Sequence, residues 1–282
     1  MFFIYNNLIM NKLMNRLFQF KNIKEVVMKK DIIIFDIDGT LVESSYKISE
    51  EHASLLNKLK KKYEIGLCGG GTLSKALEQM DKKIYFDHYF SECGCVYNKN
   101  KAKNRNHLKL ESIYTKNLRE HVLYPQINEL VKCALKFFGN VDYLLSGHFI
   151  DLRHGIIYIS CVGMQATPEE RTMFKELNKD DYIRNELITS LRHEAKLMNI
   201  DDKISIKIGG SVGIAIYPNE YDKIQILETI HHGEYENIIY FGDKYDSEGN
   251  DYYLIHSPEV KGHKIDSVEQ TFEILEKYYV ER

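Results

Sequence analysis

The stretch DIIIFDIDGTLV, residues 31–42, decides the fold of this chain. A short run rich in isoleucine, as at residues 32–35, is typical of a strand that a parallel sheet buries on both faces. Asp36 and Asp38 follow this run directly, and Gly39 permits a tight exit from the strand. Because ligands of open α/β sheets bind outside the carboxyl ends of the strands, we predict that both carboxylates face a functional site.

Two aspartates at this spacing suit phosphoryl transfer. Asp36 is predicted to attack phosphorus and form an aspartyl phosphate, while Asp38 protonates the leaving oxygen and later deprotonates the acceptor. Both carboxylates repel a phosphate, so we expect a magnesium ion (Mg2+), which takes oxygen ligands, to neutralise them. The alternative is a simple turn rich in Asp and Gly, which DxD alone does not exclude. A buried strand that runs into DxDGT favours the enzyme.

The composition is that of an ordinary soluble globular protein. A chain of 282 residues forms one large or two modest domains, and 44% apolar with 28% charged residues is usual for such proteins. A formal charge of -3 gives no basic surface for nucleic acid. The five cysteines are scattered and suggest no disulfide framework. No apolar run reaches the length of a membrane span. We therefore expect a cytoplasmic protein with no nucleic-acid or membrane partner.

Residues 1–28 form a distinct extension. They carry four basic side chains against one acidic one, among apolar residues and asparagines. This composition is compatible with a transit peptide, which leaves organellar targeting open. A disordered tail or a start codon upstream of the true one explains it equally simply, and we favour these two readings.

A second strand is predicted at residues 63–68, where it runs into GGGT at residues 69–72 and a helix at residues 73–80. A strand, a glycine turn and a helix start bind phosphate through free backbone N–H groups and the helix dipole. The candidate substrate-binding residues of this turn are Gly70, Gly71 and Thr72.

A polar connector at residues 98–106 separates this first part from an inserted α+β unit. Helical spacing is predicted at 118–138, interrupted near Pro125, and a further helix at 181–198. TPEE at residues 167–170 predicts a helix start, with Thr at the cap, Pro first and acids in the first turn. Strands are predicted at 146–153, 156–162, 204–208 and 212–217. Four strands in hairpins suggest an antiparallel sheet that helices cover on one face. The predicted organisation is an extension at 1–28, a core at 29–98 and 219–282, and a cap at 99–218.

The chain then returns to the first domain. A buried strand is predicted at residues 236–241 and ends in Gly242-Asp243-Lys244, with Gly249-Asn250-Asp251 just beyond. A metal site needs carboxylates from more than one strand end, and Asp243 supplies a second one. A GD pattern after a strand is by itself as consistent with a turn, but its pairing with FDxDGT favours a ligand.

These motifs, in this order, resemble those of the haloacid dehalogenase superfamily and, within it, the eukaryotic-type phosphomannomutases. The resemblance extends through nearly the whole chain from Lys29. It includes FDIDGTLV at 35–42, EQM at 78–80, RHG at 153–155, EER at 169–171, GG…YP at 209–218 and FGDK…GND at 241–251. It implies an α/β fold: a Rossmann-like core with a parallel sheet and an inserted α+β cap with an antiparallel sheet. It also implies Mg2+, a hexose phosphate substrate, a place in GDP-mannose biosynthesis and a homodimer through the cap.

The resemblance also implies a role for each matching residue. Asp36 is the nucleophile and a metal ligand, Asp38 is the acid/base with its backbone carbonyl on the metal, and Asp243 is the third protein ligand. Lys223 neutralises the aspartyl phosphate, and the Thr72 hydroxyl stands next to the family's phosphate-binding hydroxyl. The remaining matches are Arg153 and Arg171, which hold the distal phosphate with their planar guanidinium forks, and Asn250 and Asp251, which support the metal loop.

Four of the family's sugar-recognition positions carry other residues here. The family's recognition residues are replaced by Ser45, Met164, Gly213 and Ala215. A charge-assisted contact to phosphate is worth about 1.5–3 kcal/mol, so these losses weaken binding unless other residues compensate. The side chains we considered for this compensation are Tyr158, Lys196, Lys207 and His154.

Three functions remain at this point. The first is the interconversion of mannose 6-phosphate and mannose 1-phosphate through a hexose bisphosphate. The second is a cap-diverged phosphatase that acts on another sugar phosphate, with water as the acceptor. The third, a binding protein without catalysis, is disfavoured because Asp36, Asp38, Lys223 and Asp243 are all retained.

Overall fold

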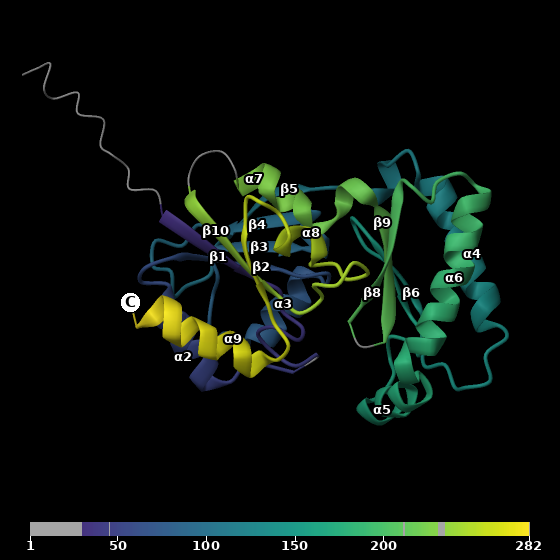
Figure 1. Cartoon of the computed structure of the whole chain (residues 1–282), viewed down its shortest axis with the longest axis horizontal. Coiled ribbons are helices and arrows are strands. Elements are labelled where there is room, and N and C mark those ends of the chain that lie inside the picture. Colours follow the sequence, from purple (N-terminus) through teal and green to yellow (C-terminus); the bar gives the residue numbers. More distant parts are fainter. Residues whose placement is uncertain (1–29, 45, 211, 231–234, 282) are drawn as a thin grey trace, which may run out of the picture.

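The computed structural model describes residues 30–44, 46–210, 212–230 and 235–281. Two β-sheets organise this part of the chain, one in each of two domains that lie side by side (Figure 1). The larger sheet takes its strands from the first and last parts of the described chain, and the strands of the smaller sheet come from the part between them. The predicted extension at residues 1–28 lies outside the described residues, and so does Ser45, where we predicted a difference in substrate recognition.

The larger sheet has seven strands in the order β11-β10-β1-β2-β3-β4-β5. Pairing is parallel from β11 to β3 and antiparallel between β3, β4 and β5. The strands are β1 (Lys30–Phe35), β2 (Glu64–Cys68), β3 (His88–Ser91), β4 (Val96–Asn100), β5 (Leu110–Thr115), β10 (Tyr235–Gly242) and β11 (Lys261–Lys264).

The strand that opened the analysis, β1, lies between β10 and β2. All four of its apolar side chains at residues 32–35 are fully buried. Ile33 and Phe35 pack in the core cluster on one face, and Ile32 and Ile34 in the cluster on the other, as the two-residue period of a strand requires. The prediction of a strand buried on both faces is therefore confirmed.

Helices cover both faces of this sheet, as expected for parallel strands. The buried residues of α2 (Glu50–Leu59), α3 (Leu73–Met80) and α9 (Val268–Leu275) share a cluster with Ile33 and Phe35. Those of α7 (Ile226–Ile230) and α8 (Tyr252–Ile255) share the cluster of the opposite face. A π-helical turn, Glu276–Val280, follows α9.

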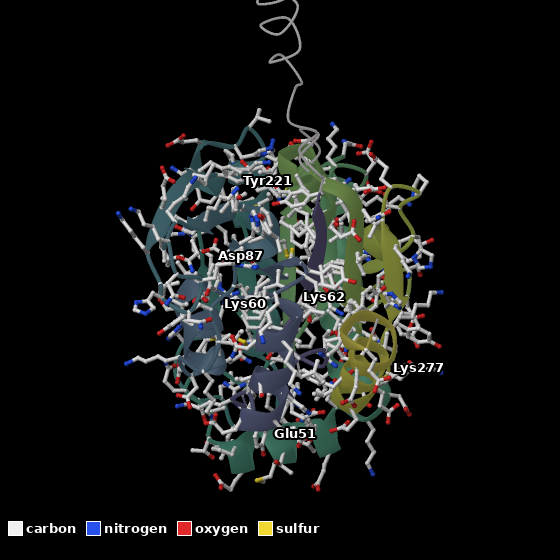
Figure 2. The ribbon with its side chains drawn as sticks, turned by 90° about the vertical axis from the view of Figure 1, so that its left-hand side faces the viewer. Glu51, Lys60, Lys62, Asp87, Tyr221 and Lys277 are labelled. Carbon is white, nitrogen blue, oxygen red and sulfur yellow. The ribbon has the colours of Figure 1, made fainter. Side chains whose placement is uncertain are left out.

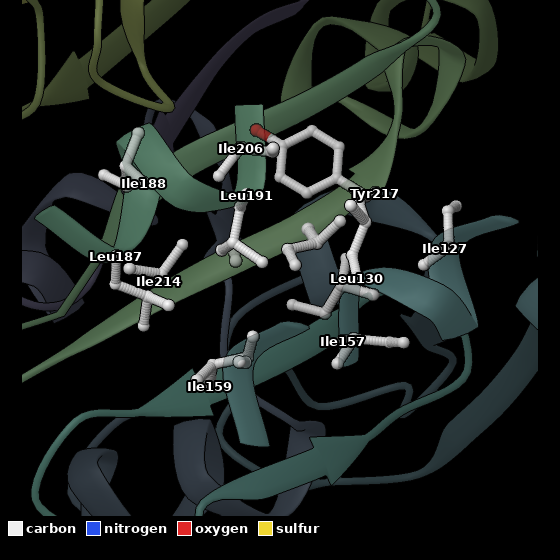
Figure 3. Packing of buried hydrophobic residues seen from close by; sticks show 14 of the residues in the cluster. Ile127, Leu130, Ile157, Ile159, Leu187, Ile188, Leu191, Ile206, Ile214 and Tyr217 are labelled. Atoms are coloured by element: carbon white, nitrogen blue, oxygen red, sulfur yellow. The ribbon is translucent and has the colours of Figure 1, made fainter. Parts of the chain in front are cut away.

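The smaller sheet is antiparallel, in the order β6-β7-β9-β8. Its isoleucines at 157, 159, 206 and 214 pack against leucines of two helices (Figure 3). The fold class we predicted, a mostly parallel α/β core with a separate antiparallel cap, is confirmed. The cap elements are β6 (Ile150–Leu152), β7 (Ile157–Ser160), β8 (Ile204–Gly209), β9 (Gly213–Pro218), α4 (Tyr124–Phe138), α5 (Pro168–Leu177) and α6 (Tyr182–Leu197).

The boundary that we predicted after residue 98 is wrong. Strands β4 and β5 extend the larger sheet, so the chain passes into the cap only after Thr115. Arg105, in the predicted connector, fastens this hairpin to the core: its Nε donates to Asp87 Oδ1 at 2.7 Å and its Nη2 to the Tyr63 carbonyl at 2.9 Å. Lys60 in turn donates to the Arg105 carbonyl at 2.5 Å (Lys60 and Asp87 are labelled in Figure 2).

Two cap elements also differ from the predicted ones. Pro125 does not interrupt a helix but lies in the first turn of α4, and a separate 3-10 turn, Leu118–Glu120, precedes that helix. Proline fits the first helical turn because the N–H that it lacks is not needed there. The strand predicted at residues 146–153 is limited to β6. Within the described residues, no helix has the length and apolar character that crossing a membrane requires.

Candidate active site

The two domains face each other across a cavity of about 360 Å³. The core contributes the carboxyl ends of β1 and β10, which lie together because Asp36 N donates to the Phe241 carbonyl at 2.9 Å. The cap contributes its sheet and α5. The predicted residues that line this cavity are Asp36, Asp38, Gly70, Gly71, Arg153, Arg171 and Asp243, together with Met164, Ala215, Tyr158 and Asn250.

Asp36 is paired with a fully buried lysine. Lys223 is fully buried, and its Nζ donates to Asp36 Oδ1 and to Asp251 Oδ1, both at 2.6 Å. Asp251 is also fully buried, accepts from the Tyr240 hydroxyl through the same oxygen, and accepts from the Lys244 N–H at 3.1 Å through the other. A buried ammonium is stable only when anions surround it, so Asp36 and Asp251 raise the pKa of Lys223 well above its usual value.

The carboxylates of Asp36, Asp243 and Asp251 form a compact cluster. Each offers an oxygen that lies within 4.8 Å of the others. Within the described part of the chain, Asp243 Oδ1 is buried without a hydrogen-bond partner, while its Oδ2 is paired with Lys244. Gly39 makes this approach possible, because at its φ of +87° a Cβ would lie 2.4 Å from Asp243 Oδ2.

This cluster is short of positive charge. Burial raises the pKa of Asp36 to about 8, even though Lys223 opposes the effect. Burial also raises the pKa of Asp243. A raised pKa disfavours the ionised form of Asp36, which is the form that attacks phosphorus. The arrangement therefore favours an additional cation next to Asp36 and Asp243.

The side chain of Asp38 does not join this cluster, and the predicted role of Asp38 at the metal required only its backbone carbonyl. Its Oδ2 accepts from Lys75 Nζ at 2.5 Å and its Oδ1 from Gln79 Nε2 at 2.7 Å. Both donors lie on α3, one turn apart. This leaves the Asp38 backbone, and not its carboxylate, as the candidate metal ligand, and the carboxylate as a proton-transfer group at the cavity.

The segment that precedes β4 donates two backbone hydrogen bonds to the glycine turn. Cys93 N donates to the Gly69 carbonyl at 3.0 Å, and Glu92 N donates to the Gly71 carbonyl at 2.9 Å. Thr72 lies behind the turn, where it is the N-cap of α3 and its hydroxyl accepts from Lys75 N. Unlike Gly70 and Gly71, Thr72 does not line the cavity, and its hydroxyl caps α3. Its contact with phosphate stays a prediction.

Both predicted arginines of the cap reach the cavity, in different settings. Arg153 Nε donates to Asp151 Oδ2 at 2.7 Å, and its Nη1 reaches across to the Gly70 carbonyl of the core at 2.8 Å. Arg171 donates to the carbonyls of Ala166 and Met164 at 3.1 and 3.3 Å. Lys175, one turn further along α5, also lines the cavity.

The cap is fixed over the core by polar contacts on both sides of the cavity. The buried carboxylate of Glu92 accepts from Gly155 N at 2.9 Å and lies 3.1 Å from His154 Nδ1. On the other side, Lys207 Nζ donates to the Ser247 carbonyl at 2.6 Å. These contacts engage two of the four side chains that we had considered as replacements for the lost recognition residues.

The other two candidate replacements lie in different places. Tyr158 lines the cavity, whereas Lys196 lies along a separate hollow beside β8. Of the departing positions, Met164 and Ala215 line the cavity, and Gly213 lies next to Tyr158. The cap side of the cavity therefore carries small or apolar residues at these departing positions, beside the cations Arg153, Arg171 and Lys175.

Sequence reasoning missed several residues of the site. Gln79 stands in the EQM motif that we noted without assigning it a role. Lys75 follows Thr72 by three positions and Lys175 follows Arg171 by four, each near a predicted helix start. Residues three or four apart share a helix face, so this spacing could have indicated both lysines. Asp251 was assigned only to a supporting turn, although it is the second anion on Lys223.

Fold and site together define a class of protein: a mostly parallel α/β sheet with paired aspartates at a strand end, beneath an inserted cap, as in haloacid dehalogenase phosphoryl-transfer enzymes. The fold is similar to that of an IMP-bound mutant IMP-nucleotidase from Plasmodium falciparum, with a TM-score of 0.61 at 16% identity over 88% of this chain and 67% of that one. It is also similar to a trehalose-6-phosphate phosphatase C-terminal domain from C. albicans, with a TM-score of 0.50 at 14% identity over 76% and 70% of the two chains.

The chain belongs to the eukaryotic phosphomannomutase family, whose model matches residues 52–281. It is 32% identical to a phosphomannomutase from Encephalitozoon cuniculi over 86% of this chain and 91% of that protein. It is 30% identical to those of Arabidopsis thaliana, over 85% and 93% of the two chains, and of Saccharomyces cerevisiae, over 88% and 94%. The family that the sequence motifs predicted is thus confirmed.

Proposed function

We propose that this chain is a phosphomannomutase that interconverts mannose 6-phosphate and mannose 1-phosphate through an aspartyl-phosphate enzyme and a hexose bisphosphate. The observation that carries the proposal is the pairing of Asp36 with the buried Lys223 at the floor of a cavity that a cationic cap closes. The phosphomannomutase names of the relatives at about 30% identity support the same substrate.

The roles of the chain's own residues follow from their contacts. A carboxylate oxygen of Asp36 attacks the phosphorus of a hexose bisphosphate, and the bond from phosphorus to the sugar oxygen breaks. Asp38 gives its proton to that leaving oxygen and later removes a proton from the sugar hydroxyl that accepts the phosphoryl group. Lys75 and Gln79 fix the Asp38 carboxylate for both transfers. Lys223 stabilises the acyl oxygen of the phosphorylated Asp36 with its positive charge.

The site also suits a magnesium ion. The Asp243 oxygen without a hydrogen-bond partner, the high pKa of Asp36 and the all-oxygen donor set match the preference of Mg2+. Asp36, Asp243 and the Asp38 carbonyl would hold it, and Asp251 would orient the loop. When bound, the ion offsets the negative charge of the phosphoryl group and of the carboxylates.

The cap holds the end of the substrate that does not react. Arg171 and Lys175 lie on one face of α5 and present positive charge to the cavity, and Arg153 presents more from β6 and the turn after it. A mutase must accept a phosphate at either end of the same sugar, so the intermediate has to turn over within the cavity. A homodimer through the cap remains a prediction from the family resemblance, and a cytoplasmic location remains a prediction from the sequence.

The test is a coupled assay with mannose 1-phosphate and Mg2+, with and without a hexose bisphosphate. We expect formation of mannose 6-phosphate, stimulated by the bisphosphate, with little release of inorganic phosphate. Release of inorganic phosphate without isomerised product would reject the mutase. That result would revive the phosphatase alternative, which the homologues do not favour.

A further inference from the structure

The guanidinium of Arg153 is held on three sides. Asp151 binds its Nε, the Gly70 carbonyl binds its Nη1, and the ring of Tyr158 lies beneath it with 4.7 Å between the guanidinium carbon and the ring centroid. In the described residues its Nη2 has no partner. An edge of the guanidinium therefore remains for an anionic ligand, while the rest of the group is fixed between the two domains.

Tyr158 is the middle residue of a row of three directly paired residues across the cap sheet. Asp151 pairs with Tyr158 in the β6–β7 ladder, and Tyr158 pairs with Ala215 in the β7–β9 ladder. Directly paired residues share one face of a sheet. Asp151 and Tyr158 are thus neighbours on the face of the cap that lies toward the core, where both reach Arg153, which follows Leu152 at the end of β6.

Small residues around Tyr158 make room for its ring. A Cβ at Gly213 would lie 2.3 Å from the Tyr158 hydroxyl oxygen and 2.6 Å from the Ile159 carbonyl. A Cβ at Gly209 would lie 3.2 Å from the Tyr158 ring. The hydroxyl then donates to the Gly209 carbonyl at 3.1 Å, which fixes the ring. Two positions that depart from the family pattern, Gly213 and Ala215, are therefore the neighbours of this tyrosine.

We propose that Tyr158 is a positioning residue that fixes the Arg153 guanidinium between the cap and the glycine turn, so that sugar-phosphate binding by this cap depends on the Tyr158 ring. A cation over an aromatic face is attracted by the ring quadrupole, most strongly when both are shielded from water. A guanidinium that is already fixed loses less freedom when it binds phosphate. The substrate class rests on the proposed function, but the positioning does not.

The first experiment measures binding of mannose 1-phosphate to the Mg2+-loaded protein by calorimetry. Tyr158→Leu removes the aromatic face, and we expect Kd to rise roughly twofold to thirtyfold. Tyr158→Phe keeps the face and should stay within about threefold of the wild type. In the Arg153→Met background, Tyr158→Leu should add nothing, because its effect passes through Arg153.

The matched control is Tyr143→Leu. Tyr143 is also a half-buried tyrosine of the cap, its hydroxyl donates to the Cys161 carbonyl at 2.9 Å, and its ring contacts Phe174. It does not line the cavity. Tyr143→Leu should lower the stability of the cap without changing Kd. An equal rise in Kd for both leucine variants, or an additive effect of Tyr158→Leu and Arg153→Met, would overturn the proposal.

The second experiment needs no ligand and so separates this proposal from the proposed function. Hydrogen exchange of the peptide that contains residues 69–72 reports the contact of Arg153 with Gly70. We expect faster exchange there in Arg153→Met and Tyr158→Leu, to a similar extent, and wild-type exchange in Tyr143→Leu. If Tyr158→Leu leaves this exchange unchanged, Tyr158 does not position Arg153, whether or not the wild type isomerises mannose 1-phosphate.

Discussion

The core side and the cap side of the cavity are built in opposite ways. On the core side, Lys223 and Asp251 are fully buried, and each charge there has an oppositely charged or hydrogen-bonding partner. On the cap side, Arg153 is paired with Asp151, but Arg171 donates to the backbone carbonyls of Ala166 and Met164, and Lys175 is exposed on α5. The departures at sugar-recognition positions within the described chain are Met164, Gly213 and Ala215, and these three lie on the cap side.

This difference has a physical reason. Removing one member of a buried charge network leaves its partner desolvated and uncompensated, so such a network changes only as a unit. A cation at the rim of a cavity is hydrated when no ligand is present, so its loss costs little stability. The chemistry of the core is therefore difficult to alter, whereas substrate recognition by the cap is easy to alter.

The largest effect is expected at Asp36. Asp36→Asn removes the nucleophile, and kcat should fall by roughly ten thousand-fold to a million-fold. A coupled isomerase assay and trapping of the phosphoenzyme measure this loss. Asp31→Asn, the same change near the other end of β1, where Asp31 accepts from Asn237, should keep the rate near that of the wild type. A rate in Asp36→Asn close to that of the control would refute the central role of the core.

Lys223→Met should have the next largest effect, on stability. It leaves Asp36 and Asp251 buried without their shared cation, which should lower the free energy of unfolding by about 3–5 kcal/mol. Urea denaturation measures this change, and adding Asp251→Asn should restore part of the loss. Lys179→Met, at an exposed cation of the cap, should cost far less. Equal losses in the two single variants would remove the contrast between the regions.

Arg171→Met should affect binding and leave chemistry largely intact. Loss of a charge-assisted contact to phosphate is worth about 1.5–3 kcal/mol, so KM should rise roughly tenfold to a hundredfold. Initial rates over a range of mannose 1-phosphate concentrations separate KM from kcat. Lys179→Met again provides the control. If kcat falls and KM stays constant, the cap takes part in the chemical step and the contrast is wrong.

The acid stability of the core should depend on Glu64. His88, and also Tyr235, hydrogen-bond this carboxylate and lower its pKa from 4.5 to about 2. A lowered pKa in the folded state gives stability that is complete above about pH 4.5 and is lost as the pH falls through 2. Glu64→Gln should therefore cost about 1–3 kcal/mol at pH 7 and progressively less between pH 4.5 and 2. Urea denaturation across this range tests it, and a cost that does not change with pH contradicts it.

The smallest expected effect is a gain in substrate binding. Met164 lines the cavity at a position where the family pattern has a phosphate-binding arginine. Met164→Arg should therefore lower KM for mannose 1-phosphate by about threefold to tenfold, because a new charge-assisted contact gains less when the site was not built around it. Met173→Arg, at an exposed methionine of α5, supplies the control. No change in KM would mean that this cap binds its ligand in another place.

Local sequence patterns were sufficient for much of the fold. The isoleucine run of β1, the strand before Asp243 and the cap strands each had a clear pattern, and parallel strands place their carboxyl ends at one edge. The β4–β5 hairpin was missed because its strands, such as VYNKN in β4, are short and rich in polar residues, and their antiparallel pairing adds them beyond β3. Arg105 fixes that hairpin through distant partners, which no periodicity reveals.

By itself, the sequence determined the chemical groups and the strand ends that carry them, because burial of an apolar strand and the short spacing of DxD are local properties. The tertiary structure alone decided which of those groups meet. Lys223 pairs with Asp36 across 187 residues, Asp38 turns to α3, and Arg153 reaches the glycine turn across 83. Such partners depend on how two domains pack, and packing is set by the whole chain at once and not by any segment of it.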